Sequence, residues 1–172
     1  FAEDIDFQNS DSTLIITWSG SDAASGISTY EYALGTTSGG TDAIDWTDAG
    51  TSTADTLTGL SLNEGSTYYL STRATDAAGN VSAVLTGDGI TIDLTAPAGT
   101  DVNDGTGEDM AHSGLDSTLS ANWAAFTESV SGIARYEYAI GTSSGGTDIV
   151  TWTDNSTTTS ITKTGLSLIS GT

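Results

Sequence analysis

The sequence predicts an all-β fold, organised as two β-sandwich modules in tandem. Short apolar runs are separated by clusters of Gly, Asp, Asn and Ser every eight to twelve residues or so, a spacing typical of sandwiches and barrels. Sequence segments also recur after about a hundred residues. This interval is the length of a whole domain with its own core, and it is too long for the unit of a solenoid repeat. We therefore expect one module at residues 1–95 and a second at 96–172.

The repeat covers strand-forming residues and turn residues alike. The matching pairs are Trp18 with Trp123, Tyr30-Glu31-Tyr32-Ala33 with Tyr136-Glu137-Tyr138-Ala139, Gly39-Gly40-Thr41-Asp42 with Gly145-Gly146-Thr147-Asp148, and Trp46-Thr47-Asp48 with Trp152-Thr153-Asp154. Tandem β modules of this kind are more often spacers and binding surfaces than enzymes.

The strands of the first module are expected from alternation, because side chains along a strand point to opposite faces in turn. In the first clear strand, Leu14, Ile16 and Trp18 share the predicted inward face. In residues 68–74 the even-numbered positions are predicted to face inward and the odd-numbered positions outward. About seven strands are expected. Their main segments are 14–18, 27–34, 44–46, 53–57, 68–74 and 90–92.

Several of these segments resemble fibronectin type III modules. They are the tryptophan at Trp18, the Ile-x-x-Tyr-x-Tyr-x-Leu segment from Ile27, Gly59-Leu60 leading to Tyr68, and Arg73-Ala74-x-Asp76-x-x-Gly79-Asn80. The Asp-x-Thr-Ala-Pro boundary from Asp93 to Pro97 is similar to that of the variant found in tandem in large bacterial surface and secreted proteins. The resemblance covers the first module throughout and the second until the chain stops.

This resemblance implies tandem seven-stranded immunoglobulin-like sandwiches. It implies core positions for Trp18 and Trp123, and a tyrosine corner at Tyr68 whose hydroxyl bonds to backbone near Leu62. The sequence has Asn63-Glu64 where Leu-x-Pro-Gly is usual, and it carries no Arg-Gly-Asp, so integrin-type recognition has no support.

The second module is expected to be incomplete. Its sequence ends at Gly171-Thr172, which match Gly65-Ser66, so the strand that bears Tyr68 and the final strand have no counterpart. A sandwich without these strands exposes core and unpaired edges. We expect a fragment of a longer chain; the alternative is that a neighbouring subunit donates the missing strands and the chain is a filament subunit.

Charge excludes some partners. Twenty-three acidic residues against three Lys and Arg give a net charge of −20, which repels nucleic acid and bare anionic membrane. No apolar run is long enough for direct membrane insertion, and without cysteine there is neither a disulfide framework nor thiol chemistry. The acidity reflects either solubility and salt tolerance or a cation role in some loops.

No catalytic constellation is apparent, and we expect a non-enzymatic protein. His112 is the one histidine, in a Gly/Asp-rich linker. The same linker is the candidate for calcium, which takes six to eight or so oxygen ligands from flexible loops; the alternative is a solvated acidic linker. The candidate ligands are Asp93, Asp101, Asn103, Asp104 and Asp109, with Glu108 nearby.

Trp46 and Trp152 are candidates for stacking on a sugar ring, although recurrence at one place in both modules fits a packing role equally well.

The function expected is a non-catalytic structural or adhesive segment, a stalk or spacer, of an extracellular bacterial surface or secreted protein. Its partners would be neighbouring modules or subunits, with glycans as a further candidate. The alternatives are a filament subunit assembled by strand exchange and a carbohydrate-binding accessory module of a secreted hydrolase.

Overall fold

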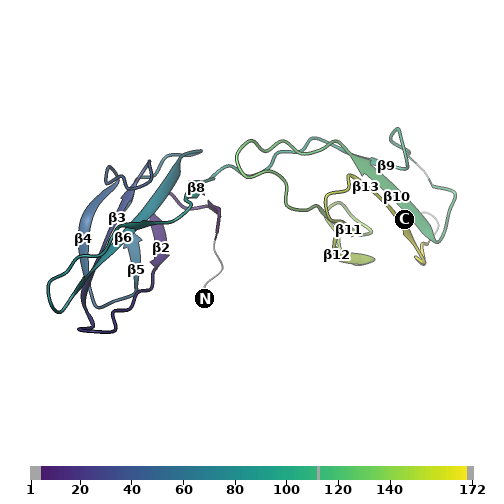
Figure 1. Cartoon of the computed structure of the whole chain (residues 1–172). Helices are drawn as coiled ribbons and strands as arrows, with labels where there is room; N and C mark the ends of the chain where they lie inside the picture. Colours follow the sequence, from purple (N-terminus) through teal and green to yellow (C-terminus); the bar gives the residue numbers. More distant parts are fainter. Residues whose placement is uncertain (1–4, 112, 170–172) are drawn as a thin grey trace. The chain divides into compact units, whose positions relative to one another are not determined.

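The computed structural model describes residues 5–111 and 113–169, and in these ranges the chain forms β strands without helices. It divides into two compact units, Phe1–Thr95 (unit 1) and Ala96–Thr172 (unit 2), coloured purple to teal and green to yellow in Figure 1. The predicted all-β class is confirmed. Within the described ranges, no helix has the length and apolarity needed to cross a membrane.

Unit 1 contains two sheets. Six strands form the larger one, in the order β1-β8-β6-β3-β4 with β7 paired to β6, and β2 pairs with β5 in the smaller one. All pairs are antiparallel except β1 with β8. The strands are β1 Phe7–Gln8, β2 Thr13–Thr17, β3 Ile27–Gly35, β4 Ile44–Gly50, β5 Ala54–Thr58, β6 Thr67–Asp76, β7 Leu85–Thr86 and β8 Ile90–Ile92.

The core of unit 1 lies between these two sheets, an arrangement consistent with a β-sandwich. Its buried side chains come from both: Leu14, Ile16, Tyr32, Leu34, Leu57, Leu62, Tyr68 and Ile92. The alternation predicted in β2 is confirmed, since Leu14 and Ile16 are buried while Ile15 between them is 76% exposed. Trp18 packs against the same cluster, with its ring centroid 5.6 Å from that of Tyr32.

Ser71 lies on the outward face predicted for β6, together with Tyr69 and Arg73, but it is buried there. Its exposed fraction is 0%, as is that of Ala33 opposite it in β3. Ser71 is a small side chain flanked on its own face by the larger Tyr69 and Arg73. Its hydroxyl also hydrogen-bonds to that of Thr86 in β7, at 3.0 Å. Small residues at the centre of a sheet are covered by their neighbours, which a period of two does not reveal.

Tyr68 is buried, and its hydroxyl accepts a hydrogen bond of 3.0 Å from the backbone N–H of Asn63. The resemblance places this contact near Leu62, one residue away. The bond ties the loop between β5 and β6 to the start of β6. Because the donor is a backbone group that would otherwise need another partner, the contact helps to fix the entry of β6 into the larger sheet.

Unit 2 repeats part of this plan. Its strands are β9 Val102–Asp104, β10 Thr118–Trp123, β11 Glu137–Ile140, β12 Val150–Asp154 and β13 Ser160–Thr164, in a sheet ordered β13-β10-β9 and a β11-β12 hairpin. The hairpin reproduces the register of β3 and β4. Tyr138 lies opposite Thr153 as Tyr32 lies opposite Thr47, with an irregularity at the next pair in both hairpins.

The core of unit 2 is less complete in the described residues. Tyr136 is its one buried apolar residue, in ring contact with Trp123 at 5.7 Å between centroids. Tyr138, Ala139 and Ile140 are half-exposed, whereas their counterparts in β3 are all buried. In unit 1 the strand β6 pairs with β3 and covers it, whereas in the described part of unit 2 β11 pairs only with β12.

Candidate functional site

The recurring Gly-Gly-Thr-Asp segment is a turn held by its aspartate. The Asp42 carboxylate accepts hydrogen bonds from the N–H and the hydroxyl of Thr36, both at 2.9 Å. A Cβ on Gly35 would overlap the carbonyl carbon of Gly40, so only glycine allows the two arms of the turn to approach this closely. The backbone bond from Thr36, followed by its hydroxyl bond, lowers the pKa of Asp42 below the ordinary value of 3.8.

Unit 2 contains the same turn. Asp148 accepts from the N–H of Thr142 at 3.0 Å and from its hydroxyl at 2.9 Å, and these bonds lower the pKa of Asp148. A Cβ on Gly141 would overlap Gly146. The repeated sequence is therefore explained by the architecture of the turn.

Other loop carboxylates of unit 1 act in a similar way. Asp22 Oδ2 accepts from the backbone N–H of Ala24, Ser25 and Gly26 at 3.1, 2.7 and 2.9 Å, and these bonds, that of Ser25 foremost, lower its pKa. Asp76 accepts from Asn80, through its side-chain amide at 2.8 Å and its N–H at 2.7 Å, with the same effect on the pKa of Asp76. Many of the acidic side chains thus hold loops.

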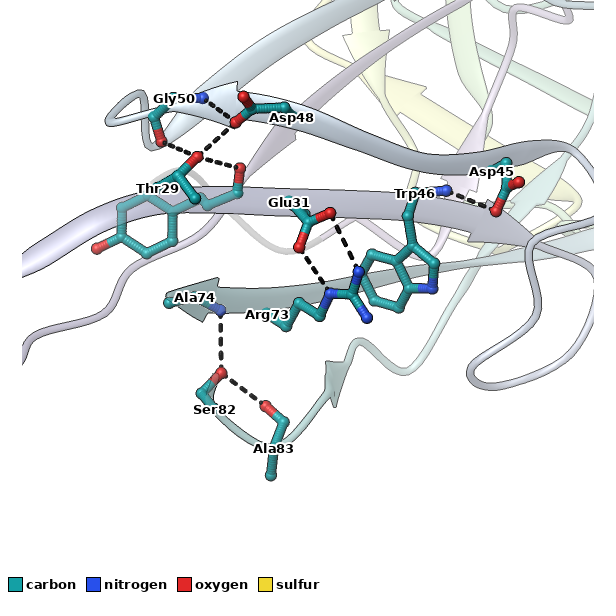
Figure 2. Close-up of polar contacts among 11 residues, drawn as sticks. Thr29, Glu31, Asp45, Trp46, Asp48, Gly50, Arg73, Ala74, Ser82 and Ala83 are labelled. Atoms are coloured by element: carbon teal, nitrogen blue, oxygen red, sulfur yellow. Dashed lines mark hydrogen bonds and ion pairs between the residues drawn. The ribbon is translucent and has the colours of Figure 1, made fainter. Parts of the chain in front are cut away.

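The carboxylate of Asp48, near the end of β4, also accepts hydrogen bonds from nearby residues. Figure 2 shows its carboxylate between the hydroxyl of Thr29 and the N–H of Gly50, the latter at 2.8 Å. Both bonds, that from Thr29 first, lower the pKa of Asp48. The bond to Thr29 joins β4 to β3, so this carboxylate stabilises the pairing of two strands as well as the turn that follows.

Asp42→Asn is expected to destabilise unit 1 at neutral pH and much less in acid. Because folding lowers the pKa of Asp42 below 3.8, the ionised carboxylate favours the folded state. This contribution is fully present above pH 3.8 and is lost as the pH falls through the lower, folded-state pKa. Thermal unfolding of the chain and the variant, at about pH 7 and about pH 2.5, measures the difference.

Asp11→Asn is the matched control, since it removes one exposed carboxylate outside these turns. Its effect on the melting temperature is expected to be small at neutral pH. An Asp42→Asn difference that stays constant across the pH range would show that the Asp42 bonds do not depend on its charge.

The candidate calcium ligands are distributed over both units. Asp93 follows β8 in unit 1 and accepts from the N–H of Thr95 at 3.2 Å. Asn103 and Asp104 lie in β9, and Asp109 Oδ1 accepts from the N–H of Asp104 at 3.1 Å. Asp101 is exposed. In residues 5–111 and 113–169, no three His, Cys, Asp or Glu side chains gather as a metal-binding group, and calcium stays a prediction.

The segment analysed as a linker thus contains a strand. Three residues, of which only Val102 is apolar, give no alternation signal, and the pairing of β9 with β10 is visible only in the structure. His112 lies outside the described residues.

Trp46 takes part in a cluster that spans three adjacent strands of unit 1. The guanidinium carbon of Arg73, on β6, lies 4.3 Å from the centroid of the Trp46 ring on β4. Arg73 also donates two hydrogen bonds to Glu31 on the intervening β3, from Nε at 2.8 Å and from an η nitrogen at 3.1 Å. Figure 2 shows the guanidinium against the indole and its two bonds to the carboxylate.

Unit 2 has two of these three residues. Glu137 on β11 and Trp152 on β12 occupy the positions of Glu31 and Trp46. Trp152 is 67% exposed, and the Glu137 side chain is 44% exposed against 27% for Glu31. Glu137 contacts Arg135 at 3.5 Å, an exposed ion pair of little expected energy.

Beside this pair an apolar groove of about 460 Å³ opens within unit 2. It is lined from both sheets, by side chains that include Leu119, Trp123, Tyr138, Ile140, Trp152 and Ile161. The sequence placed Trp152 in a candidate site but not Arg73, Glu31 or Glu137. One signal was present, since Arg73 is the single basic residue of residues 1–95.

No protein-family model matches the chain, and a search of curated proteins finds no match.

Proposed function

We propose that the chain is a non-catalytic structural segment, a stalk or spacer, of an extracellular bacterial surface or secreted protein, built from fibronectin type III-like sandwiches. The observation that carries the proposal is that the features shared by the two units are scaffold features. They are the register of the hairpin, the turn closed by Asp42 or Asp148, and the tryptophan at Trp18 or Trp123 in contact with tyrosine rings.

Two further observations support this proposal. Trp18 against the core and the Tyr68 hydroxyl on backbone are the contacts that the family resemblance implies for such a sandwich. The net charge of −20 favours a soluble surface and disfavours nucleic-acid partners. The acidic loop residues with lowered pKa values are engaged in holding their own loops, as expected of a segment whose role is mechanical.

A filament subunit is the second candidate, and the observation behind it is that β11 pairs with β12 alone in residues 113–169. The carbohydrate-binding alternative now depends on Trp152, because one face of the Trp46 ring is occupied by Arg73. Sedimentation of the chain over a range of concentrations distinguishes these classes: a spacer stays monomeric, whereas a filament subunit associates. A glycan-binding screen with Trp152→Ala as the control tests the carbohydrate alternative.

Single-molecule pulling on the full 172-residue chain tests the spacer role. We expect one discrete event for unit 1, whose 95 residues at about 3.4 Å each would lengthen the tether by roughly 300 Å. Ile16→Ala should lower the force of this event, because Ile16 is buried; Ile15→Ala, at the exposed neighbouring position, should leave it unchanged. A tether that lengthens smoothly, without a discrete event, would contradict a load-bearing role.

A further inference from the structure

We propose that Asp88 and Gly89, in the turn between β7 and β8 of unit 1, form a site of spontaneous chemical modification, at which Asp88 isomerises to isoaspartate through a cyclic imide. This reactivity is independent of the spacer role. The chain contains two Asp-Gly pairs, Asp88-Gly89 and Asp104-Gly105. Glycine has no side chain to hinder attack of its backbone nitrogen on the preceding carboxyl, so both pairs have the sequence that the reaction needs. Their surroundings in the fold differ.

Asp88 lies in a bulge of the larger sheet. The strand β8 pairs with β6 as far as Ile90, and β7 resumes the pairing at Thr86. In between, the two residues 69–70 of β6 lie opposite the three residues 87–89. An extra residue on one strand interrupts the ladder of hydrogen bonds and is left without a pairing partner.

The bulge leaves the two reacting groups free. The Asp88 side chain is exposed. Within residues 5–111 and 113–169, neither its carboxylate nor the N–H of Gly89 has a hydrogen-bond partner. The ladder continues at Gly87, whose N–H donates to the carbonyl of Leu70 at 2.9 Å. The nitrogen of Gly89 and the carboxyl of Asp88 are therefore adjacent in the chain and not held by other contacts.

The second pair, Asp104-Gly105, is held in place. Gly105 is buried, and its N–H donates to the carbonyl of Ser120 at 2.7 Å. The N–H of Asp104 donates to the carboxylate of Asp109 at 3.1 Å, and its carbonyl accepts from the N–H of Met110, also at 3.1 Å. The nitrogen of Gly105 can attack only after it has given up its own bond, so this pair is expected to react more slowly.

The reaction requires only water. The backbone nitrogen of Gly89 forms a bond to the side-chain carboxyl carbon of Asp88, and the hydroxyl of that carboxyl group, in its acid form, leaves as water with the proton of the nitrogen. A second water then opens the ring. Addition at the side-chain carbonyl restores aspartate. Addition at the main-chain carbonyl breaks its bond to the nitrogen, so that the backbone runs through the side chain and the main-chain carboxylate becomes free.

Isoaspartate at this point would disturb β8. It lengthens the backbone by one methylene group beside Gly89, where space is limited, because a Cβ on Gly89 would lie 2.7 Å from Cγ2 of Thr67 and 2.9 Å from Cε1 of Tyr69. The next strand, β8, contributes Ile92 to the core, with an exposed fraction of 0%. We therefore expect the isomerised chain to unfold at a lower temperature than the unmodified chain.

Incubation of the full chain in heavy-oxygen water, followed by peptide mapping with mass spectrometry, tests the proposal. Each opening of the ring by solvent places one heavy oxygen in the residue. We expect label and isoaspartate to accumulate at Asp88 about tenfold faster than at Asp104, a factor that corresponds to about 1.4 kcal/mol for the hydrogen bond that must first break. Asp88→Ser, which has no carboxyl to form the ring, should abolish the signal there and leave that at Asp104 unchanged.

Incubation in concentrated guanidinium chloride is the matched control, because unfolding removes the Gly105 bond and the two pairs should then react at similar rates. The proposal is overturned if Asp88 gains no label under conditions in which a synthetic peptide of residues 84–92 does, or if Asp88 and Asp104 react equally in the folded chain. A difference that persists in denaturant would also overturn it, since the local sequence and not the fold would then set the rates. Thermal unfolding of the isomerised chain measures the effect on β8, and an unchanged melting temperature would contradict that part.

Discussion

Trp18→Ala is expected to lower the free energy of unfolding of unit 1 by about 3–5 kcal/mol, a large part of the stability of a domain of this size. The indole packs against the core between the two sheets, and its ring centroid lies 5.6 Å from that of Tyr32 and 6.3 Å from that of Tyr30. Removing it leaves a cavity beside the rings of Tyr30 and Tyr32, which are held in β3. Aromatic contacts of this geometry are lost in addition to buried area.

Urea unfolding measures this loss as a lower midpoint with an unchanged slope, and thermal unfolding as a drop of more than ten degrees or so. Trp46→Ala is the control of equal size. Both indoles are half-buried, but Trp46→Ala should cost clearly less, because Trp46 packs under Arg73 whereas Trp18 packs against the core cluster. Similar losses at the two positions would mean that Trp18 does not belong to the core.

Leu34→Ala is expected to cost about 2–5 kcal/mol, whereas Ile140→Ala at the equivalent position of unit 2 should cost much less. Leu34 is 1% exposed, covered by β6 on one side and by the smaller sheet on its inner face. Ile140 is half-exposed and lines the open groove, so its truncation enlarges a space that already reaches solvent.

Hydrogen exchange under native conditions measures the stability of each unit separately within one chain. Leu34→Ala should accelerate exchange throughout unit 1 and leave unit 2 unchanged. Equal destabilisation by the two variants would show that unit 2 has a closed core.

Alternation made the inner face of β2 predictable from sequence, because one buried face and one exposed face leave a period of two at Leu14, Ile15 and Ile16. Alternation assigned Ser71 to the outer face of β6 but did not predict its burial, which depends on the size of its neighbours and not on its own polarity. It also missed β9, which is too short and too polar to carry a pattern. A period of two assigns each side chain to a face of the sheet, but it does not report how far the neighbouring side chains cover it.

The side-chain clusters were harder to predict, because they join residues that are distant in sequence. The turn glycines were recognisable, but the bonds from Thr36 to Asp42 depend on how closely the two arms of the turn approach. Arg73, Glu31 and Trp46 come together only once β6, β3 and β4 are neighbours in the sheet. A single basic residue in an acidic domain is a signal that sequence reading can use.

In the part of unit 2 that the structure describes, one edge of β11 is unpaired, and this edge bears on association between copies of the chain. An open strand edge beside apolar side chains is a template for pairing between copies of the same protein. A net charge of −20 opposes such encounters, because every approaching copy carries the same sign. At physiological ionic strength this repulsion reaches only about 8 Å, so added salt lets copies approach more closely. The acidic surface thus protects the exposed edge by keeping like chains apart.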